Sequence, residues 1–133
     1  MHIKRLLRPR NILLAVVLFT ILATIAFLMP GSSIPSIRIQ TFVGMDKLVH
    51  AGIHFLLVFG WLFYYARHYS KVKMRTIAYI SLSCVAYGII IELLQWMTKT
   101  RGAELADVFA NMVGTGLGLL VLLTIKSKIK MKP

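Results

Sequence analysis

The chain has 133 residues, a net charge of +12 and a mean hydropathy of +0.77; 58% of its residues are hydrophobic and 15% are charged. This length suffices for one domain, and a soluble domain of this size is usually less apolar and more charged. The positive charges form short clusters between apolar runs, which is typical of membrane topology, so we do not expect nucleic-acid binding.

Four apolar runs predict four transmembrane helices. The first, residues 11–29, contains no charged side chain and stops at Pro30. At about 1.5 Å per residue it covers roughly 29 Å, close to the hydrocarbon thickness of a bilayer. The remaining spans are expected at about residues 48–66, 77–97 and 108–125. We therefore predict an all-α fold, a four-helix transmembrane bundle, with residues 1–133 as a single integral membrane domain.

The first apolar run follows a basic segment, as the core of a signal peptide also would. Its apolar stretch is longer than the roughly 7–15 residues of such a peptide. No small-residue cleavage pattern precedes Pro30. We therefore expect a retained helix.

The distribution of lysine and arginine predicts the orientation. Twelve of the sixteen lie in residues 4–10, 67–75 and 126–132. The positive-inside rule places these three segments in the cytoplasm. We therefore predict a multi-pass protein of the cytoplasmic (inner) membrane, with both termini cytoplasmic and the lipid bilayer as its surroundings.

The chain has only four carboxylates, which are Asp46, Glu92, Glu104 and Asp107. In the predicted topology all four fall at or near the outer face. Glu92 lies inside the third span, where a charged side chain costs on the order of 2.5–3.5 kcal/mol by insertion scales. We expect Glu92 to face a partner or a water-filled pocket, and this position favours a functional role.

Other polar residues join the carboxylates at helical spacing. Asp46, His50 and His54 are each four residues apart and therefore share one face of the second span. The third and fourth spans continue the pattern with the pairs Glu92–Gln95 and Asp107–Asn111. Three helices thus carry polar faces at a similar depth, which predicts one candidate site in the outer third of the membrane.

Structural roles compete with functional ones for several of these residues. Asp46 and Asp107 could cap the helices that they begin. His50 is more simply a hydrogen-bonded buried histidine than a metal ligand. Gly114 and Gly118 form a G-x-x-x-G pair, which favours packing within the bundle over a dimer interface. Capping alone, however, does not explain why every acid gathers on one side.

Three short motifs occur in a characteristic order. Residues 46–50 read D-K-L-V-H, residues 92–95 read E-L-L-Q, and an arginine at 101 precedes D-V-F-A-N-M-V-G at 107–114. Together they resemble the D-K-x-x-H, E-x-x-Q and R…D-x-x-x-N-x-x-G motifs of VanZ-like membrane proteins, over roughly residues 30–120. That family often has an aromatic residue a few positions after the histidine, where this chain has His54 and Phe55, so the role of His54 stays open.

The resemblance implies a small bacterial membrane protein. The founding member of the family is associated with low-level resistance to the glycopeptide teicoplanin, and a resistance role does not transfer automatically to every relative. The site that the resemblance implies consists of Asp46, Lys47, His50, Glu92, Gln95, Arg101, Asp107 and Asn111. We assign it no metal ion and no cofactor.

Three functions compete for this site, and the oligomeric state is left open. The first is a binding or accessory role toward an envelope component, such as a lipid-linked precursor, a lipid headgroup or a glycopeptide. The second is an intramembrane enzyme acting on an envelope lipid or glycan, with Glu92 or Asp107 as general base and His50 as acid or metal ligand. The third is an ion-coupled transporter, which is disfavoured because the inner halves of the spans are almost wholly apolar.

Overall fold

The computed structural model describes residues 8–29, 44–69, 72–98 and 104–128. Within them the chain forms four α-helices, and each is long and apolar enough to cross a membrane. Their bounds are α2 at Pro9–Leu28, α3 at Met45–His68, α4 at Met74–Thr98 and α5 at Leu105–Lys128. The predicted all-α, four-helix membrane fold is confirmed.

All four helices begin two or three residues earlier than the apolar runs predict. Gly44, with φ 99°, is the N-cap of α3, and Asp46 lies in the first turn of that helix. Asp107 likewise lies in the first turn of α5. The capping role considered for these two acids is therefore wrong, because both belong to the helices themselves. A carboxylate in the first turn still interacts favourably with the helix dipole.

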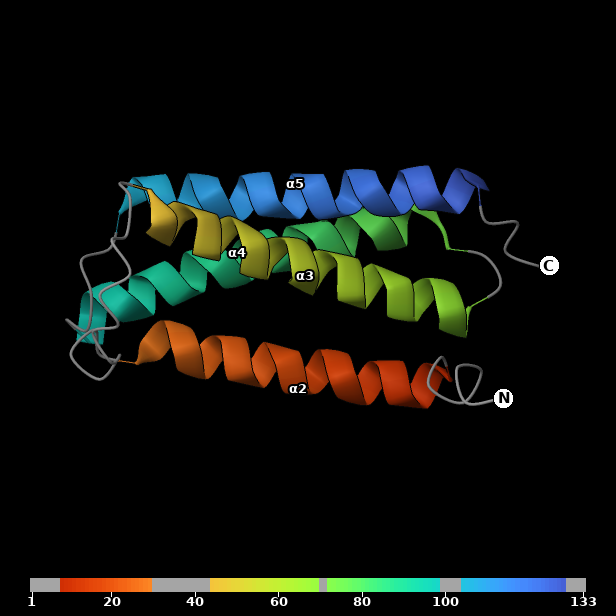
Figure 1. The fold of residues 1–133 in the computed structure, drawn as a ribbon, viewed down its shortest axis with the longest axis horizontal. Helices are drawn as coiled ribbons and strands as arrows, with labels where there is room; N and C mark the ends of the chain where they lie inside the picture. Colours follow the sequence, from red (N-terminus) through yellow and green to blue (C-terminus); the bar gives the residue numbers. More distant parts are fainter. Residues whose placement is uncertain (1–7, 30–43, 70–71, 99–103, 129–133) are drawn as a thin grey trace.

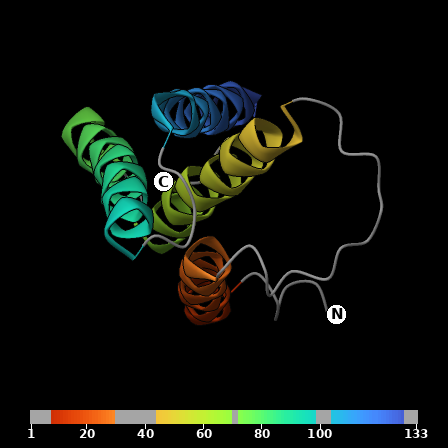
Figure 2. The same ribbon diagram turned by 90° about the vertical axis from the view of Figure 1, so that its left-hand side faces the viewer.

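Successive helices run in opposite directions, and α3 lies at the centre of the bundle (Figures 1 and 2). It packs against α2, α4 and α5, and most closely against α5. The start of α2, the end of α3, the start of α4 and the end of α5 share one end of the molecule. We call the opposite end, which holds Asp46, Glu104 and Asp107, the acidic end.

The close approach of α3 and α5 depends on two glycines. A Cβ added at Gly114 would overlap the backbone of Ala51, and one at Gly118 would overlap the backbone carbonyl of Phe55 and the side chain of Val58. Small residues permit this kind of backbone contact between membrane helices. The prediction that the G-x-x-x-G pair packs within the bundle is confirmed.

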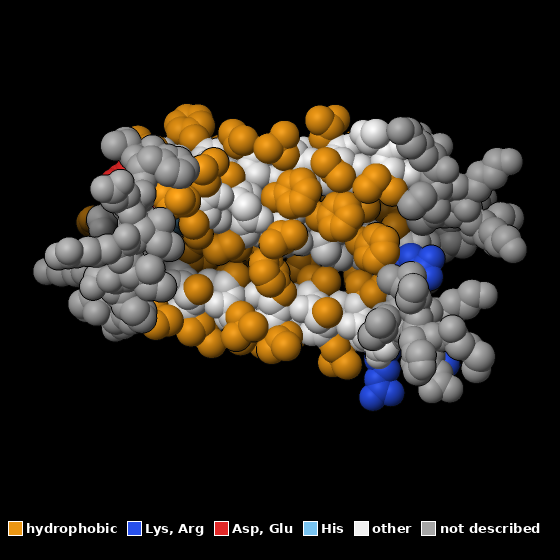
Figure 3. All heavy atoms as spheres, in the orientation of Figure 1, with side chains coloured by type: hydrophobic (Ala, Val, Ile, Leu, Met, Phe, Trp, Pro, Cys, Tyr) orange, Lys and Arg blue, Asp and Glu red, His pale blue; other side chains and the backbone are white. Residues whose placement is uncertain are grey.

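Apolar side chains also cover the outside of the bundle. Figure 3 shows them around its middle, with lysine and arginine side chains at the end opposite the acidic end. Many large apolar residues on all four helices are exposed, among them Leu18, Leu82 and Leu120. An apolar outer surface is what lipid contact requires, since lipid tails solvate such side chains. The described helices therefore form a multi-pass membrane bundle in contact with lipid.

Candidate functional site

Polar side chains from α3, α4 and α5 are buried together near the acidic end. Buried polar groups in proteins are normally hydrogen-bonded, so this concentration requires an explanation. The polar residues of the described helices that are exposed by less than 5% are His50, His54, Glu92, Gln95, Asp107, Asn111 and Thr115. The helical spacing predicted the common faces of the first six, and the packing of the bundle turns these faces inward.

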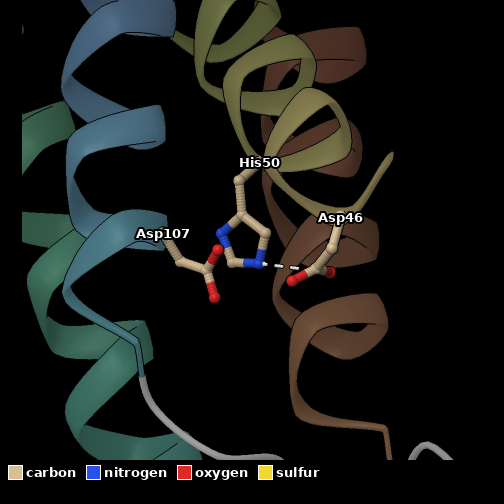
Figure 4. Close-up of side chains that lie close together, drawn as sticks. All are labelled: Asp46, His50 and Asp107. Carbon is tan, nitrogen blue, oxygen red and sulfur yellow. Dashed lines mark ion pairs between the residues drawn. The ribbon is translucent and has the colours of Figure 1, made fainter. Parts of the chain in front are cut away.

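His50 lies at the centre of this group and is 1% exposed. Its Nδ1 lies 3.1 Å from Asn111 Oδ1 and 3.4 Å from Glu92 Oε1. Its Nε2 lies 3.9 Å from Asp46 Oδ1, one helical turn earlier on α3 (Figure 4). The imidazole thus contacts polar groups from three helices, with a different set of partners at each nitrogen.

Lys47 lies at the mouth of the site, with its side chain 35% exposed. Its ammonium forms ion pairs with Glu104, with Asp107 Oδ1 at 3.2 Å and with Asp46 Oδ2 at 3.7 Å. The hydrogen bond and the charge of Lys47 hold the pKa of Glu104 below its usual range. One ammonium group therefore contacts three carboxylates at the acidic end.

Several buried atoms have no hydrogen-bond partner among the described residues. They include both carboxylate oxygens of Glu92, both ring nitrogens of His54 and the amide nitrogen of Asn111. Asp107 Oδ1 also has no hydrogen-bond partner among the described residues, although it lies 3.2 Å from the Lys47 ammonium. The cluster therefore has donors and acceptors that the described chain does not use.

The spacing groups Gln95 with Glu92, but the side chain of Gln95 contacts α2 instead. Its Nε2 donates a hydrogen bond of 2.8 Å to the backbone carbonyl of Phe27, which joins α4 to the last turn of α2. The ring of Phe27 lies 4.8 Å from that of His50 and closes the site on the α2 side. Phe27 was missed, because a phenylalanine in an uncharged apolar run gives no chemical signal. Arg101, the remaining predicted site residue, lies outside the described residues.

One set of side chains has the spacing of metal ligands. One atom each of Asp46, His50 and Asp107 lies within 4.8 Å of the others. His50 and Asp107 are buried, whereas Asp46 is exposed. Figure 4 shows the two carboxylates on either side of the imidazole.

Comparison with known proteins identifies the family of this sequence. The sequence model of the VanZ/LLP1 family matches residues 6–126. The chain belongs to the VanZ/LLP1 family. No curated protein and no solved structure matches this member of it.

The VanZ/LLP1 match covers α2, α3, α4, all but the last two residues of α5, and every residue of the predicted site. The match confirms the resemblance to VanZ-like proteins that the three motifs indicate. The geometry adds that Asp46, Lys47, His50, Glu92, Asp107 and Asn111 lie together in this VanZ/LLP1 protein, while Gln95 lies beside them.

A second feature of this VanZ/LLP1 chain is an apolar pocket of about 340 Å³ between α2, α3 and α4. Its wall includes Leu57, Trp61 and Tyr87. Tyr87 connects the pocket to the polar cluster, because its ring lies 5.8 Å from that of His54 and its hydroxyl hydrogen-bonds Thr24 Oγ1 at 2.8 Å. An apolar space thus lies deeper in the bundle than the charged site.

Proposed function

We propose that this VanZ/LLP1 protein is a binding or accessory factor for a polar envelope component in the outer leaflet of the cytoplasmic membrane, with a lipid-linked precursor as the best fit. The observation that carries the proposal is the arrangement around His50. A buried imidazole contacts Glu92 and Asn111, and the half-exposed Lys47 lies beside it at the mouth. Such a site can accept and donate hydrogen bonds and pair with an anionic group at once.

The depth of the site supports a ligand at the membrane interface. His50 lies five positions after the start of α3, and Glu92 lies six positions before the end of α4. At about 1.5 Å per residue these distances are roughly 8–9 Å from the helix ends. For a hydrocarbon core of about 30 Å, this is the region where headgroups meet acyl chains.

The charges indicate the chemistry of the ligand. Lys47 suits a phosphate or carboxylate, whereas Glu92 and Asp46 suit hydroxyl or amine donors. The apolar pocket below the cluster suits part of a hydrocarbon tail. These features together favour a lipid-linked molecule with a mixed headgroup, and a glycopeptide such as teicoplanin has the same kinds of polar groups. We also propose that binding of such a ligand contributes to glycopeptide resistance of the cell.

The proposed orientation has the acidic end outside and both termini in the cytoplasm. Arg8, Arg67 and Lys73 lie at helix ends opposite the acidic end, which agrees with the positive-inside rule.

The test uses a strain in which deletion of the protein changes sensitivity to teicoplanin or another envelope antibiotic. Glu92→Gln and His50→Ala are expected to behave like the deletion. Ser81→Ala is the matched control, because Ser81 Oγ is also a buried atom on α4 without a described partner but is far along the helix from Glu92. If the Glu92→Gln and His50→Ala strains had wild-type antibiotic sensitivity at wild-type protein levels, the proposal would be contradicted.

A second candidate function is an intramembrane enzyme acting on the same class of envelope lipid or glycan. The observation that favours it is the 3.4 Å contact between Glu92 Oε1 and His50 Nδ1. A carboxylate–imidazole pair can move a proton in general acid–base catalysis. Purified protein incubated with lipid-linked precursors should then release product, and Glu92→Gln should abolish the release. Binding without turnover by the wild type would leave only the accessory role.

A further inference from the structure

The apolar pocket between α2, α3 and α4 lies mostly in the half of the bundle away from the acidic end. Of its lining residues, Tyr79 and Tyr87 come five and thirteen positions after the start of α4, and Trp61 comes seven positions before the end of α3. At about 1.5 Å per residue, the pocket therefore extends from roughly 8 to 20 Å below the opposite end, which we call the basic end. Half of a hydrocarbon core is about 15 Å thick, so this is the depth of acyl chains in the leaflet at the basic end.

The pocket is open to the bilayer on one side. Tyr79 is 65% exposed and Ser83 is also exposed, whereas Leu57 and Cys84 are buried. A lining of exposed and buried residues together describes a recess in the lipid-facing surface. Its volume of about 340 Å³ is within the range of ligand pockets. An unfilled recess would forfeit dispersion contacts of its walls, and the medium around it is hydrocarbon, so we expect a hydrocarbon chain in it.

One face of α4 connects the pocket with a positive charge. Four-residue spacing puts on this face the residues Arg75, Tyr79, Ser83 and Tyr87. The last three line the pocket, and Arg75 is an exposed residue in the first turn of the helix. Arg75 thus lies about one turn, roughly 6 Å, closer to the basic end than Tyr79. The phosphate of a lipid lies at this level when one of its acyl chains enters the pocket.

The basic end offers cations to an anionic headgroup. Figure 3 shows lysine and arginine side chains there, and the exposed ones at or beside the helix ends include Arg10, Arg67, Lys73 and Arg75. All four carboxylate side chains of the chain are described, and they lie toward the acidic end. On α4 itself, Glu92 is seventeen residues from Arg75, which is roughly 26 Å along the helix. Lipid phosphates are therefore the anions within reach of these cations, and basic sites between membrane helices bind anionic headgroups in this way.

We infer that the pocket binds one acyl chain of an anionic glycerophospholipid whose phosphate pairs with Arg75. In the proposed orientation this lipid belongs to the cytoplasmic leaflet, which is the leaflet whose anionic lipids attract basic residues. The chain contacts α2, α3 and α4 together, so its binding stabilises the packing of α2 on the bundle. A tail of the proposed outer-leaflet ligand would displace this chain from the pocket. The phospholipid site itself does not rest on the proposed function.

The test measures lipid binding to the full chain in dodecyl maltoside by native mass spectrometry. The probes are phosphatidylglycerol and phosphatidylcholine with identical acyl chains. We expect one saturable phosphatidylglycerol per chain and about fivefold weaker binding of phosphatidylcholine, since one basic contact contributes about this factor. Arg75→Gln should remove most of this preference. Ser83→Phe fills part of the pocket and should weaken the binding of both lipids severalfold.

Two matched controls separate the site from general effects of charge and bulk. Arg67→Gln removes an exposed cation at the same end, but Arg67 is six positions after Trp61 and therefore on a different face of α3. Ala78→Phe adds the same aromatic ring at an exposed position of α4 outside the pocket lining. Both controls should bind phosphatidylglycerol as the wild type does.

Three results would overturn the inference. They are equal binding of the two lipids by the wild type, equal effects of Arg75→Gln and Arg67→Gln, and equal effects of Ser83→Phe and Ala78→Phe. Arg75 and Ser83 are exposed, so their substitution leaves the packed interior of the bundle in place. As a second measurement, phosphatidylglycerol should raise the melting temperature of the wild type more than that of Arg75→Gln. The assay contains no envelope precursor, so its failure leaves the proposed headgroup binding intact.

Discussion

Glu92 is a carboxylate buried deep among the helices. It is 4% exposed, and its Oε1 lies 3.4 Å from His50 Nδ1. Membrane interiors rarely hold a carboxylate without a functional reason, because desolvation disfavours its charge. Residues retained for function commonly reduce stability. At the scale of the residue, function and stability are therefore expected to conflict at Glu92.

This conflict predicts that Glu92→Gln stabilises the purified protein. The amide keeps the shape of the side chain and removes its charge, so we expect the free energy of unfolding to rise by about 0.5–2 kcal/mol. Thermal unfolding in detergent measures the change. A loss of stability would mean that pairing with His50 already compensates for burial of the carboxylate.

The Glu104–Lys47 pair predicts a pH dependence with a definite sign. Lys47 lowers the pKa of Glu104 in the folded protein, so the pair stabilises the fold above the ordinary glutamate pKa of about 4.3. This stabilisation is lost as the pH falls through the lowered pKa. Glu104→Gln should therefore lower the melting temperature at pH 7, and the difference from the wild type should disappear in strong acid. A difference that grows toward low pH would contradict the pairing.

The sequence determined which residues share a face, but not the partner of each. Four-residue spacing put Asp46 and His50 on one side of α3, and the structure has them in contact. Three-residue spacing also grouped Gln95 with Glu92, yet Gln95 turns to the backbone of Phe27. Spacing fixes an angle around one helix, whereas the partner depends on how neighbouring helices are rotated against it.

At the scale of the helix, the contact between α3 and α5 positions the site. It brings Asp107 and Asn111 of α5 against Lys47 and His50 of α3. The helix starts extend about three residues beyond the apolar runs, and hydropathy could not find this extension. Backbone hydrogen bonding sets where a helix begins, and it continues through polar residues at the interface.

The close packing of these helices predicts that Gly114→Ala is destabilising by about 1–3 kcal/mol. The added methyl group would overlap the backbone of Ala51, so α3 and α5 must separate. Gly116→Ala is the matched control, because a Cβ there meets nothing within 4 Å and it lies on the same helix. Gly116→Ala should be neutral or stabilising. Equal melting temperatures for the two variants would show that the helices can part without cost.

At the scale of the whole molecule, the bundle is polar at both ends but in different ways. Its acidic end combines buried polar groups with three carboxylates, whereas its other end holds arginines and lysines at the helix ends. The count of cations in the sequence predicts the orientation of this asymmetric bundle. The fold itself does not determine it, because a bundle of four antiparallel helices can be inserted either way.

Thiol labelling tests the orientation directly. Cys84 is the only cysteine and is buried, so a Cys84→Ser background allows one new cysteine at each end. Glu104→Cys should react with a membrane-impermeant maleimide in intact cells. Lys73→Cys should react only after the cells are permeabilised, because the positive-inside rule keeps this basic connection in the cytoplasm. The reverse pattern would place the acidic end in the cytoplasm, and a site for an outer-leaflet component would then be on the wrong side.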